Sequence, residues 1–250
     1  MSATLPTPRE IPVDERLIFA LDLPTVTEAR QLIDRLEGQV RFFKLGLELF
    51  MAGGIFELLD ELRRRDTRVF VDLKFFDVPA TVARAVARLA ERGATFATVH
   101  GNQAMMEAAA AAKGDQLKIL AVTALTSLDR GDLDDLGFAC DLEALVLSRA
   151  RRALEAGCDG VVSSGLEVKR LRQEVDSRLV VVTPGIRPLD NRETDDQKRI
   201  VTPTQALQQG ADYLVIGRPI RDAVDPAAAA AAIQAEIRQA LLGRQHHARA

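Results

Sequence analysis

Residues 69–82 constrain the fold most, because this segment carries charged residues where the local pattern favours buried apolar ones. Its first half is apolar and β-branched enough to form a strand of a parallel sheet that is covered on both faces. Side chains alternate along a strand, so Asp72 and Lys74 point to the same face. Pro79 suits the first turn of a helix, where its missing N–H costs nothing. The segment therefore predicts a strand, a short charged loop and a helix.

Two interpretations of these charges are open. Asp72 and Lys74 could form a structural ion pair at the end of a strand, with Asp77 favouring the start of the following helix. Buried pairs of this kind contribute little net stability, so their presence alone does not assign a role. The alternative is a functional site, and the rest of the chain bears on that choice.

Units of one strand followed by one helix recur along the chain. Apolar runs predict strands at residues 17–22, 40–45, 69–74, 95–99, 117–122, 160–163, 179–182 and 213–216. Helical spacing or strong helix formers follow at 25–36, 55–62, 79–92, 104–112, 142–156, 167–174, 203–210 and in the alanine-rich segment that closes the chain. Eight such units in 250 residues fit a single-domain (β/α)8 TIM barrel of the α/β class better than an open sheet.

We expect the barrel to occupy residues 17–243, with an N-terminal extension at 1–16 and a C-terminal tail at 244–250. The extension has no apolar core of signal-peptide length, and no stretch reaches the roughly 18 apolar residues of a membrane span. The net charge of −3 provides no basic excess for nucleic acid. A soluble cytoplasmic protein with no membrane or nucleic-acid partner is expected.

Polar residues gather at the predicted strand ends, where barrel enzymes place their active sites. They are Asp22, Lys44, Asp72, Lys74, His100, Thr126, Arg187 and Arg218. We expect His100 to be structural rather than catalytic. Cys140 and Cys158 lack metal-ligand spacing, so neither a disulfide nor a zinc site is expected.

Lys44, Asp72, Lys74 and Asp77 form a set of charges that sums to zero, which a desolvated site tolerates better than a lone ion. A held ammonium can donate a proton or stabilise a developing carbanion. A fixed carboxylate repels an anionic substrate group and loses that repulsion when the group leaves. Loss of CO₂ fits this description.

Two segments near the end of the chain predict a phosphate site. Residues 183–197 and the pair Gly217-Arg218 follow the seventh and eighth predicted strands, where barrels commonly hold phosphate with backbone N–H groups and Arg side chains. Arg187 or Arg218 alone would be read as a surface charge. Their positions at the ends of adjacent strands favour phosphate binding.

Residues 72–81, Asp-Leu-Lys-Phe-Phe-Asp-Val-Pro-Ala-Thr, resemble the D-x-K-x-x-D-I/V-P-x-T signature of the orotidine 5′-phosphate decarboxylase family. The pattern of this signature is specific. The likeness extends over nearly the whole chain, through residues 21–22, 43–46, 99–100, 122–127, 183–188, 196–197 and 215–219. The resemblance implies decarboxylation of orotidine 5′-phosphate to UMP and CO₂ in de novo pyrimidine biosynthesis, without a metal or any other cofactor.

The resemblance also implies roles for individual residues. Lys74 would protonate C6 of the pyrimidine, and Asp72 would lie against the substrate carboxylate. Lys44 would orient the charges and contact the ribose. Asp77 would reach the ribose in the neighbouring subunit of a homodimer.

The other implied roles concern binding. Asp22 would bind a ribose hydroxyl, as would Thr81 from the partner chain, and Thr126 would hydrogen-bond the pyrimidine. The residues implied at the phosphate are Pro184, Arg187, Gln197, Gly217 and Arg218, with residues 184–197 acting as a closing loop.

The chain departs from the family pattern after His100, where Gly-Asn-Gln-Ala replaces a run of Ala and Gly, and no role is assigned there. A rival is a sibling barrel enzyme that acts on a sugar phosphate and uses Mg²⁺. Such an enzyme needs an acidic ligand at the end of the second strand, where Lys44 stands instead. A catalytically silent nucleotide-binding barrel is the remaining alternative.

Overall fold

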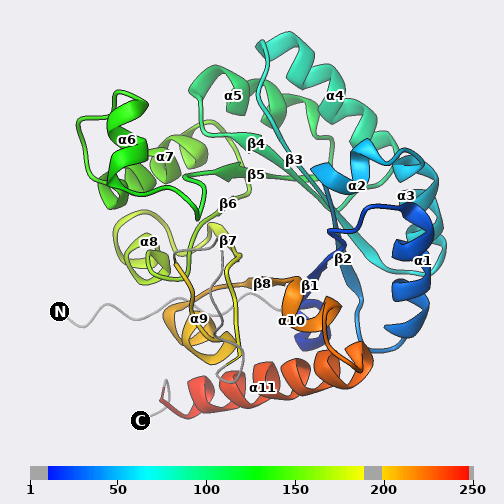
Figure 1. Ribbon diagram of the computed structural model, residues 1–250. Coiled ribbons are helices and arrows are strands. Elements are labelled where there is room, and N and C mark those ends of the chain that lie inside the picture. Colours follow the sequence, from blue (N-terminus) through cyan, green and yellow to red (C-terminus); the bar gives the residue numbers. More distant parts are fainter. Residues whose placement is uncertain (1–10, 189–198, 248–250) are drawn as a thin grey trace.

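The computed structural model describes residues 11–188 and 199–247. Within this part of the chain, eight parallel strands pair in sequence order, and the last pairs with the first to close a barrel. Helices surround the barrel on the outside (Figure 1). The (β/α)8 architecture predicted from the alternation of strands and helices is therefore confirmed.

The strands are β1 Leu17–Ala20, β2 Phe42–Gly46, β3 Arg68–Phe75, β4 Phe96–His100, β5 Lys118–Val122, β6 Gly160–Val162, β7 Val180–Thr183 and β8 Tyr213–Ile216. The helices are α1 Val26–Arg35, α2 Leu47–Met51, α3 Ile55–Arg64, α4 Pro79–Glu91, α5 Gln103–Ala112, α6 Arg130–Asp135, α7 Leu142–Glu155, α8 Val168–Glu174, α9 Pro203–Gln209, α10 Arg218–Arg221 and α11 Pro226–His247. A 3-10 turn, η1 Val13–Glu15, precedes β1.

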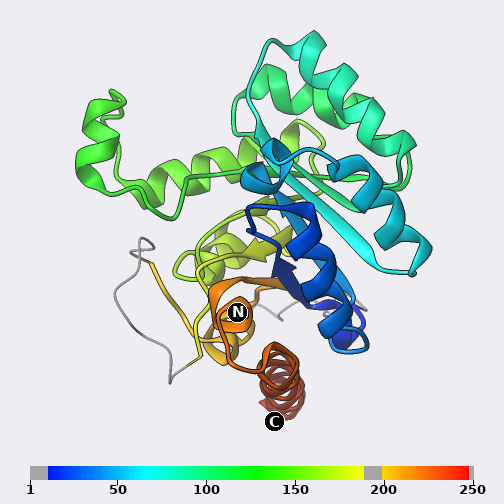
Figure 2. The same cartoon turned by 45° about the vertical axis from the view of Figure 1, so that its right-hand side comes forward.

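The elements η1, α2, α6 and α10 were not expected from the sequence. Each spans three to six residues, which is too short to show a helical period of apolar positions. Figure 2 shows that α6 stands away from the barrel wall, within the long connection between β5 and α7. Its first turn is closed by a capping box between Asp129 and Asp132, so local hydrogen bonds fix it without a large buried face.

The alternation of side chains divides the core into two layers. Val69 and Val71 of β3 pack outward, in the cluster shared with the surrounding helices. Phe70 points inward and joins a smaller cluster inside the barrel. This is the arrangement expected for a strand that is covered on both faces.

Aromatic rings fill the amino-terminal end of the barrel. Phe42, Phe96 and Tyr213 each begin their strand, and their ring centroids lie 5.1–5.8 Å apart. Phe70 packs edge-on against Phe96 at 5.9 Å. Because this end is packed solid, space for a ligand is left at the carboxyl ends of the strands.

Residues on both sides of the expected barrel domain also contact the core or continue a helix. Before β1, the Arg16 side chain is buried and donates from Nη1 to the Asp212 carbonyl oxygen at 3.0 Å. The partly buried side chain of Ile11 packs against the cluster inside the barrel. At the other end, α11 continues through residues 244–247, which the sequence assigned to a tail. In the described part of the chain, no helix has both the length and the apolar character that crossing a membrane requires.

Candidate active site

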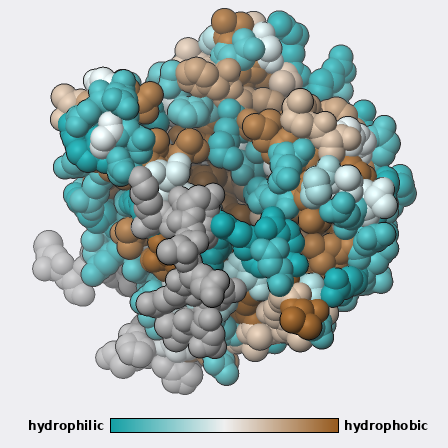
Figure 3. All heavy atoms as spheres, in the orientation of Figure 1, coloured by the Kyte–Doolittle hydropathy of each residue, from teal (hydrophilic) through white to brown (hydrophobic). Residues whose placement is uncertain are grey.

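A cavity of about 570 Å³ opens at the carboxyl ends of the strands. Its volume lies within the range of roughly 300–1,000 Å³ that is common for small-molecule sites. The surface is hollowed near its centre when the barrel is viewed as in Figure 3. Nine of the residues singled out in the sequence line the cavity: Asp22, Lys44, Asp72, Lys74, Thr126, Pro184, Arg187, Gly217 and Arg218.

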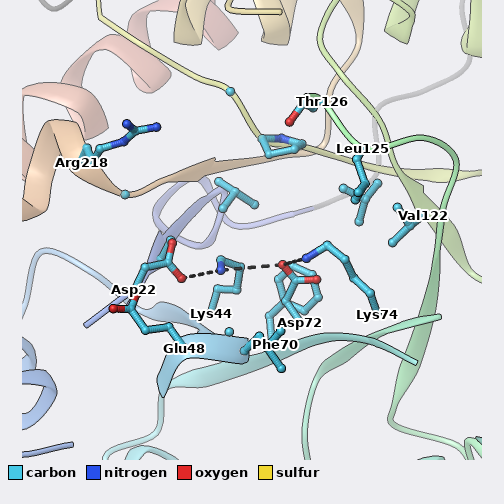
Figure 4. A pocket seen from close by; sticks show the side chains of 18 of the residues that line it. Asp22, Lys44, Glu48, Phe70, Asp72, Lys74, Val122, Leu125, Thr126 and Arg218 are labelled. Atoms are coloured by element: carbon cyan, nitrogen blue, oxygen red, sulfur yellow. Dashed lines mark hydrogen bonds and ion pairs between the residues drawn. The ribbon is translucent and has the colours of Figure 1, made fainter. Parts of the chain in front are cut away.

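Four of these side chains form a row of alternating charge (Figure 4). Lys44 Nζ lies 2.9 Å from Asp22 Oδ1 and 3.7 Å from Asp72 Oδ2. Lys74 Nζ lies 3.0 Å from the same Asp72 Oδ2. The side chains of Lys44 and Asp72 are only 10% and 13% exposed, so the middle of the row is shielded from water.

Burial and charge act in opposite directions on the two central groups. Burial lowers the pKa of Lys44, but the charges of Asp72 and Asp22 and its hydrogen bonds with them raise that pKa above its usual value. Burial raises the pKa of Asp72, but the charges of Lys44 and Lys74 and hydrogen bonds from Lys74 and Thr98 hold it below its usual value. Lys44 and Asp72 therefore stay ionised at neutral pH.

The main chain at Lys74 departs from a regular strand. Its φ of +49° lies in the left-handed region, which costs a non-glycine residue on the order of 1–3 kcal/mol. The register between β3 and β4 also shifts between Val71 and Phe75. Asp72 and Lys74 do face one another as the sequence predicted, but an irregular segment brings them together rather than a regular pleat.

Gly46, the last residue of β2, leaves room for the ion pair between Asp22 and Lys44. A Cβ at this position would lie 2.9 Å from both Asp22 Oδ1 and Lys44 Nζ, closer than real Cβ contacts come. A larger residue would therefore displace the pair.

Arginines gather on the side of the cavity formed by the ends of β7 and β8. Arg187 and Arg218 are joined by Arg221, which was not expected from the sequence. Arg221 Nη1 donates to the Asp22 carbonyl oxygen at 2.8 Å, and Arg221 Nε contacts Asp222 Oδ1 at 2.6 Å. The hydrogen bond from Arg221, followed by the charges of Arg221, Arg218 and Arg187, holds the pKa of Asp222 below its usual value despite the opposing effect of burial. This side of the cavity suits an anion.

The sequence of residues 15–233 matches the family described as Orotidine 5′-phosphate decarboxylase / HUMPS family. The chain belongs to this family. Its sequence is 66% identical to the orotidine 5′-phosphate decarboxylase of Methylococcus capsulatus, across 92% of this chain and 95% of that one. The enzyme of the same name from Stenotrophomonas maltophilia is 51% identical, across 92% and 96% of the two chains. The crystal structure of orotidine 5′-phosphate decarboxylase from Lactobacillus acidophilus superposes with a TM-score of 0.79 at 35% identity, covering 89% of this chain and 99% of that one.

Two residues that the resemblance implies, Asp77 and Thr81, are not among the residues that line the cavity of their own chain. Asp77 is exposed, and its Oδ1 accepts a hydrogen bond from the Val78 N–H at 2.6 Å. Thr81, on the first turn of α4, accepts from Arg84 Nη2 at 3.2 Å. Gln197 lies outside the described residues.

His100 lies near the charge row but is not among the residues that line the cavity. Burial, followed by the charges of Arg149 and Lys74, lowers the pKa of His100. Its ring packs edge-on against Phe76 with centroids 5.0 Å apart. This environment favours a neutral, packed imidazole, as expected of a structural residue.

Three further residues at the site were missed in the sequence. Arg221 follows Arg218 by three residues, which places both on one side of a helical turn, and this spacing could have revealed it. Glu48 lines the cavity from α2 and has no sequence signal beyond its charge. Thr98 lies in the middle of an apolar strand, and only the pairing of β3 with β4 brings it to the charge row.

In the part of the chain that the structure describes, no group of three or more His, Cys, Asp or Glu side chains is arranged to hold a metal ion. The carboxylates of Asp22 and Asp72 instead share the Lys44 ammonium. A cation between two acids occupies the position in which a metal would need their oxygens.

The charge row predicts a specific dependence of stability on pH. Because the pKa of Asp72 is lowered on folding, its contribution is present above the unfolded value of about 3.9 and is lost as pH falls through the folded value. Because the pKa of Lys44 is raised, its contribution is present below about 10.4 and is lost as pH rises through the folded value. In a double-mutant cycle of Lys44→Met and Asp72→Asn, urea unfolding should show a coupling that is constant from about pH 5 to 9 and shrinks below about pH 4.

A matched control is the exposed pair Arg88 and Glu91 on α4, whose coupling should be small at every pH. A coupling between Lys44 and Asp72 that stayed unchanged below pH 4, in protein that is still folded, would contradict the assignment of Asp72 as the titrating group.

Proposed function

We propose that this chain converts orotidine 5′-phosphate to UMP and CO₂ in the last step of de novo pyrimidine biosynthesis, using neither a metal nor a coenzyme. The observation that carries the proposal is the position of the Lys74 ammonium inside the cavity, 3.0 Å from the Asp72 carboxylate, which also contacts Lys44. Relatives with 51–66% identity that bear the decarboxylase name support it. A cytoplasmic location is part of the proposal, because the charged substrate and product do not cross a membrane unaided.

The proposed chemical step needs only these two side chains. The substrate carboxylate lies beside Asp72, and the two negative charges repel each other until CO₂ departs. The bond from C6 to the carboxyl carbon breaks, and its electron pair stays on C6. The ammonium of Lys74 stabilises this charge and then transfers a proton from Nζ to C6. Solvent restores the proton on Lys74 after the product leaves.

Lys44 keeps the row charged while the reaction proceeds. Its ammonium lies between Asp22 and Asp72, and its raised pKa makes it a weaker acid than an ordinary lysine. Lys44 and Asp22 together present a donor and an acceptor for the ribose hydroxyls. We assign these two residues to ribose binding for that reason.

The arginine side of the cavity is proposed to hold the phosphate. Arg187 and Arg218 supply charge, and Gly217 and Pro184 supply the surrounding main chain. Gln197, which lies outside the described residues, is assigned to the phosphate from the family resemblance alone. Figure 4 shows Arg218 and Thr126 across the cavity from Lys74. Thr126 is assigned to the pyrimidine. Binding energy gained at the remote phosphate can position the base against the charge row.

A homodimer is proposed because Asp77 and Thr81 lie away from the cavity of their own chain. The residues on both sides of Asp77, Phe76 and Val78, are each 63% exposed. Met51 on α2 is also largely exposed, at 75%. Such apolar exposure favours a covered surface, and a second copy placed there would receive Asp77 and Thr81 at its ribose.

The Mg²⁺-dependent sibling that acts on a sugar phosphate is the main alternative. The assay that separates the two follows the loss of absorbance when orotidine 5′-phosphate is added to purified protein, with and without EDTA. We expect the same rate in both conditions, because the proposed step draws its positive charge from Lys74 and Lys44. Activity abolished by EDTA and restored by Mg²⁺ would favour the sibling reaction, and binding without turnover would favour a silent barrel.

The role of Lys74 predicts a loss of turnover without loss of binding. Lys74→Ala should reduce kcat by at least about 10²–10⁴-fold, the usual contribution of a general acid. UMP affinity, measured by calorimetry, should change less than about tenfold, because the ammonium acts mainly on charge that develops during the reaction. The control is Lys118→Ala, at an exposed position at the start of β5. Near-normal turnover in Lys74→Ala would refute the role.

The shared site predicts complementation between two inactive proteins. In a mixture of Lys74→Ala and Asp77→Ala, each mixed dimer should contain one site with both residues intact. After equal mixing and random exchange, activity should recover to about a quarter of the wild-type level. Subunit exchange is verified by native mass spectrometry. Exchange without recovered activity would show that each chain builds its site alone.

A further inference from the structure

We propose that Thr98 is a positioning residue for the reaction, because its single hydroxyl group holds both the carboxylate of Asp72 and the main chain of Lys74. This inference rests on the proposed function, since it concerns the same two side chains. Thr98 lies in the middle of β4 and is completely buried. It is not among the residues that line the cavity, so it acts through its neighbours rather than on the substrate.

The hydroxyl group makes two hydrogen bonds of equal length. Thr98 Oγ1 accepts from the Lys74 backbone N–H at 2.9 Å, and it donates to Asp72 Oδ1 at 2.9 Å. An N–H can only donate and an ionised carboxylate can only accept, so the direction of both bonds is fixed. The one hydroxyl proton is therefore committed to Asp72.

This commitment orients the carboxylate. With Oδ1 occupied by Thr98, Asp72 presents Oδ2 to Lys74 at 3.0 Å and to Lys44 at 3.7 Å. A carboxylate without this anchor could rotate and exchange its oxygens between partners. Thr98 thus fixes which oxygen faces the two ammonium groups, in a site where fixed dipoles act more strongly than in water.

The second bond stabilises the irregular main chain. Between the paired positions Val71 with Ala97 and Phe75 with Val99, four residues of β3 span the length that two residues of β4 span. Thr98 is the β4 residue opposite this bulge. Its hydroxyl takes the Lys74 N–H that a regular ladder would have paired, which a buried donor requires. The left-handed turn at Lys74, with φ of +49°, is held in this way.

Both effects determine where the ammonium sits. The left-handed turn sets the starting direction of the Lys74 side chain, and Asp72 sets its end point at Nζ. A displacement of about 1 Å at such a site can reduce the rate by roughly 100-fold. Loss of the Thr98 hydroxyl should therefore slow the chemical step more than it weakens substrate binding.

The test compares two substitutions that separate shape from the hydroxyl group. Thr98→Val keeps the branched shape without the hydroxyl, whereas Thr98→Ser keeps the hydroxyl without the methyl group. We expect Thr98→Val to lower kcat by about 10–100-fold with KM and UMP affinity changed less than about threefold. Thr98→Ser should retain kcat to within about threefold of the wild type. Rates are expressed per mole of folded enzyme, counted by UMP-binding stoichiometry.

Equal kcat values for Thr98→Val and Thr98→Ser would overturn the inference, as would a loss in Thr98→Val that disappears after correction for unfolded protein. If Thr98→Val does not fold, Thr98→Cys replaces it, since a thiol is a weak donor of similar size. A kcat for Thr98→Cys clearly below that of Thr98→Ser would support the inference, and equal values would overturn it. Absence of decarboxylation in the wild type would instead refute the proposed function, so the two failures are distinguishable.

Discussion

The carboxylate of Asp72 is the group on which the site depends, because one buried acid is shared by two ammonium groups. Its Oδ2 lies 3.0 Å from Lys74 and 3.7 Å from Lys44. Removal of the Asp72 carboxylate would leave the buried Lys44 ammonium with Asp22 alone and would take away the acid that Lys74 contacts. The fold must therefore deliver both lysines to one point. Adjacent parallel strands β2 and β3 do this, since Lys44 pairs in register with Phe70, two residues before Asp72.

The barrel separates stability from chemistry along its axis. Phe42, Phe96 and Tyr213 pack the amino-terminal end of the barrel. Their contacts therefore do not limit which residues can line the cavity at the carboxyl ends of the strands. Strand ends at the opposite side supply the polar groups. The left-handed turn at Lys74 is tolerated there because regularly paired parts of β3 and β4 flank it. The regular parts of the two strands thus hold Lys74 in an unfavourable main-chain conformation that the stability of the sheet does not require.

Much of the fold and part of the site could be predicted from the sequence. Apolar runs and helical spacing mark the eight units, and position at a strand end is enough to single out Lys44, Asp72 and Lys74. Thr98 could not be found in this way, because the hydrogen-bond partners of its hydroxyl group depend on the register between β4 and β3. The turn at Lys74 also depends on that register. Asp77 is prominent in the sequence but lies away from its own cavity, and the pattern within one chain does not place a residue relative to a second copy.

Charge balance explains why the two sides of the cavity differ. The row of Asp22, Lys44, Asp72 and Lys74 sums to zero, so it offers little net attraction to an anion as a whole. The arginine side supplies that attraction, because Arg187, Arg218 and Arg221 all line it. The hydrogen bond from Arg221, followed by the charges of these arginines, also lowers the pKa of Asp222. The arginines would attract a substrate through its phosphate, and the carboxylate of the same substrate would then be placed against Asp72. In the proposed reaction, favourable binding of the phosphate would therefore hold the substrate carboxylate in its unfavourable position beside Asp72, and remote binding energy would thus act on the reacting bond.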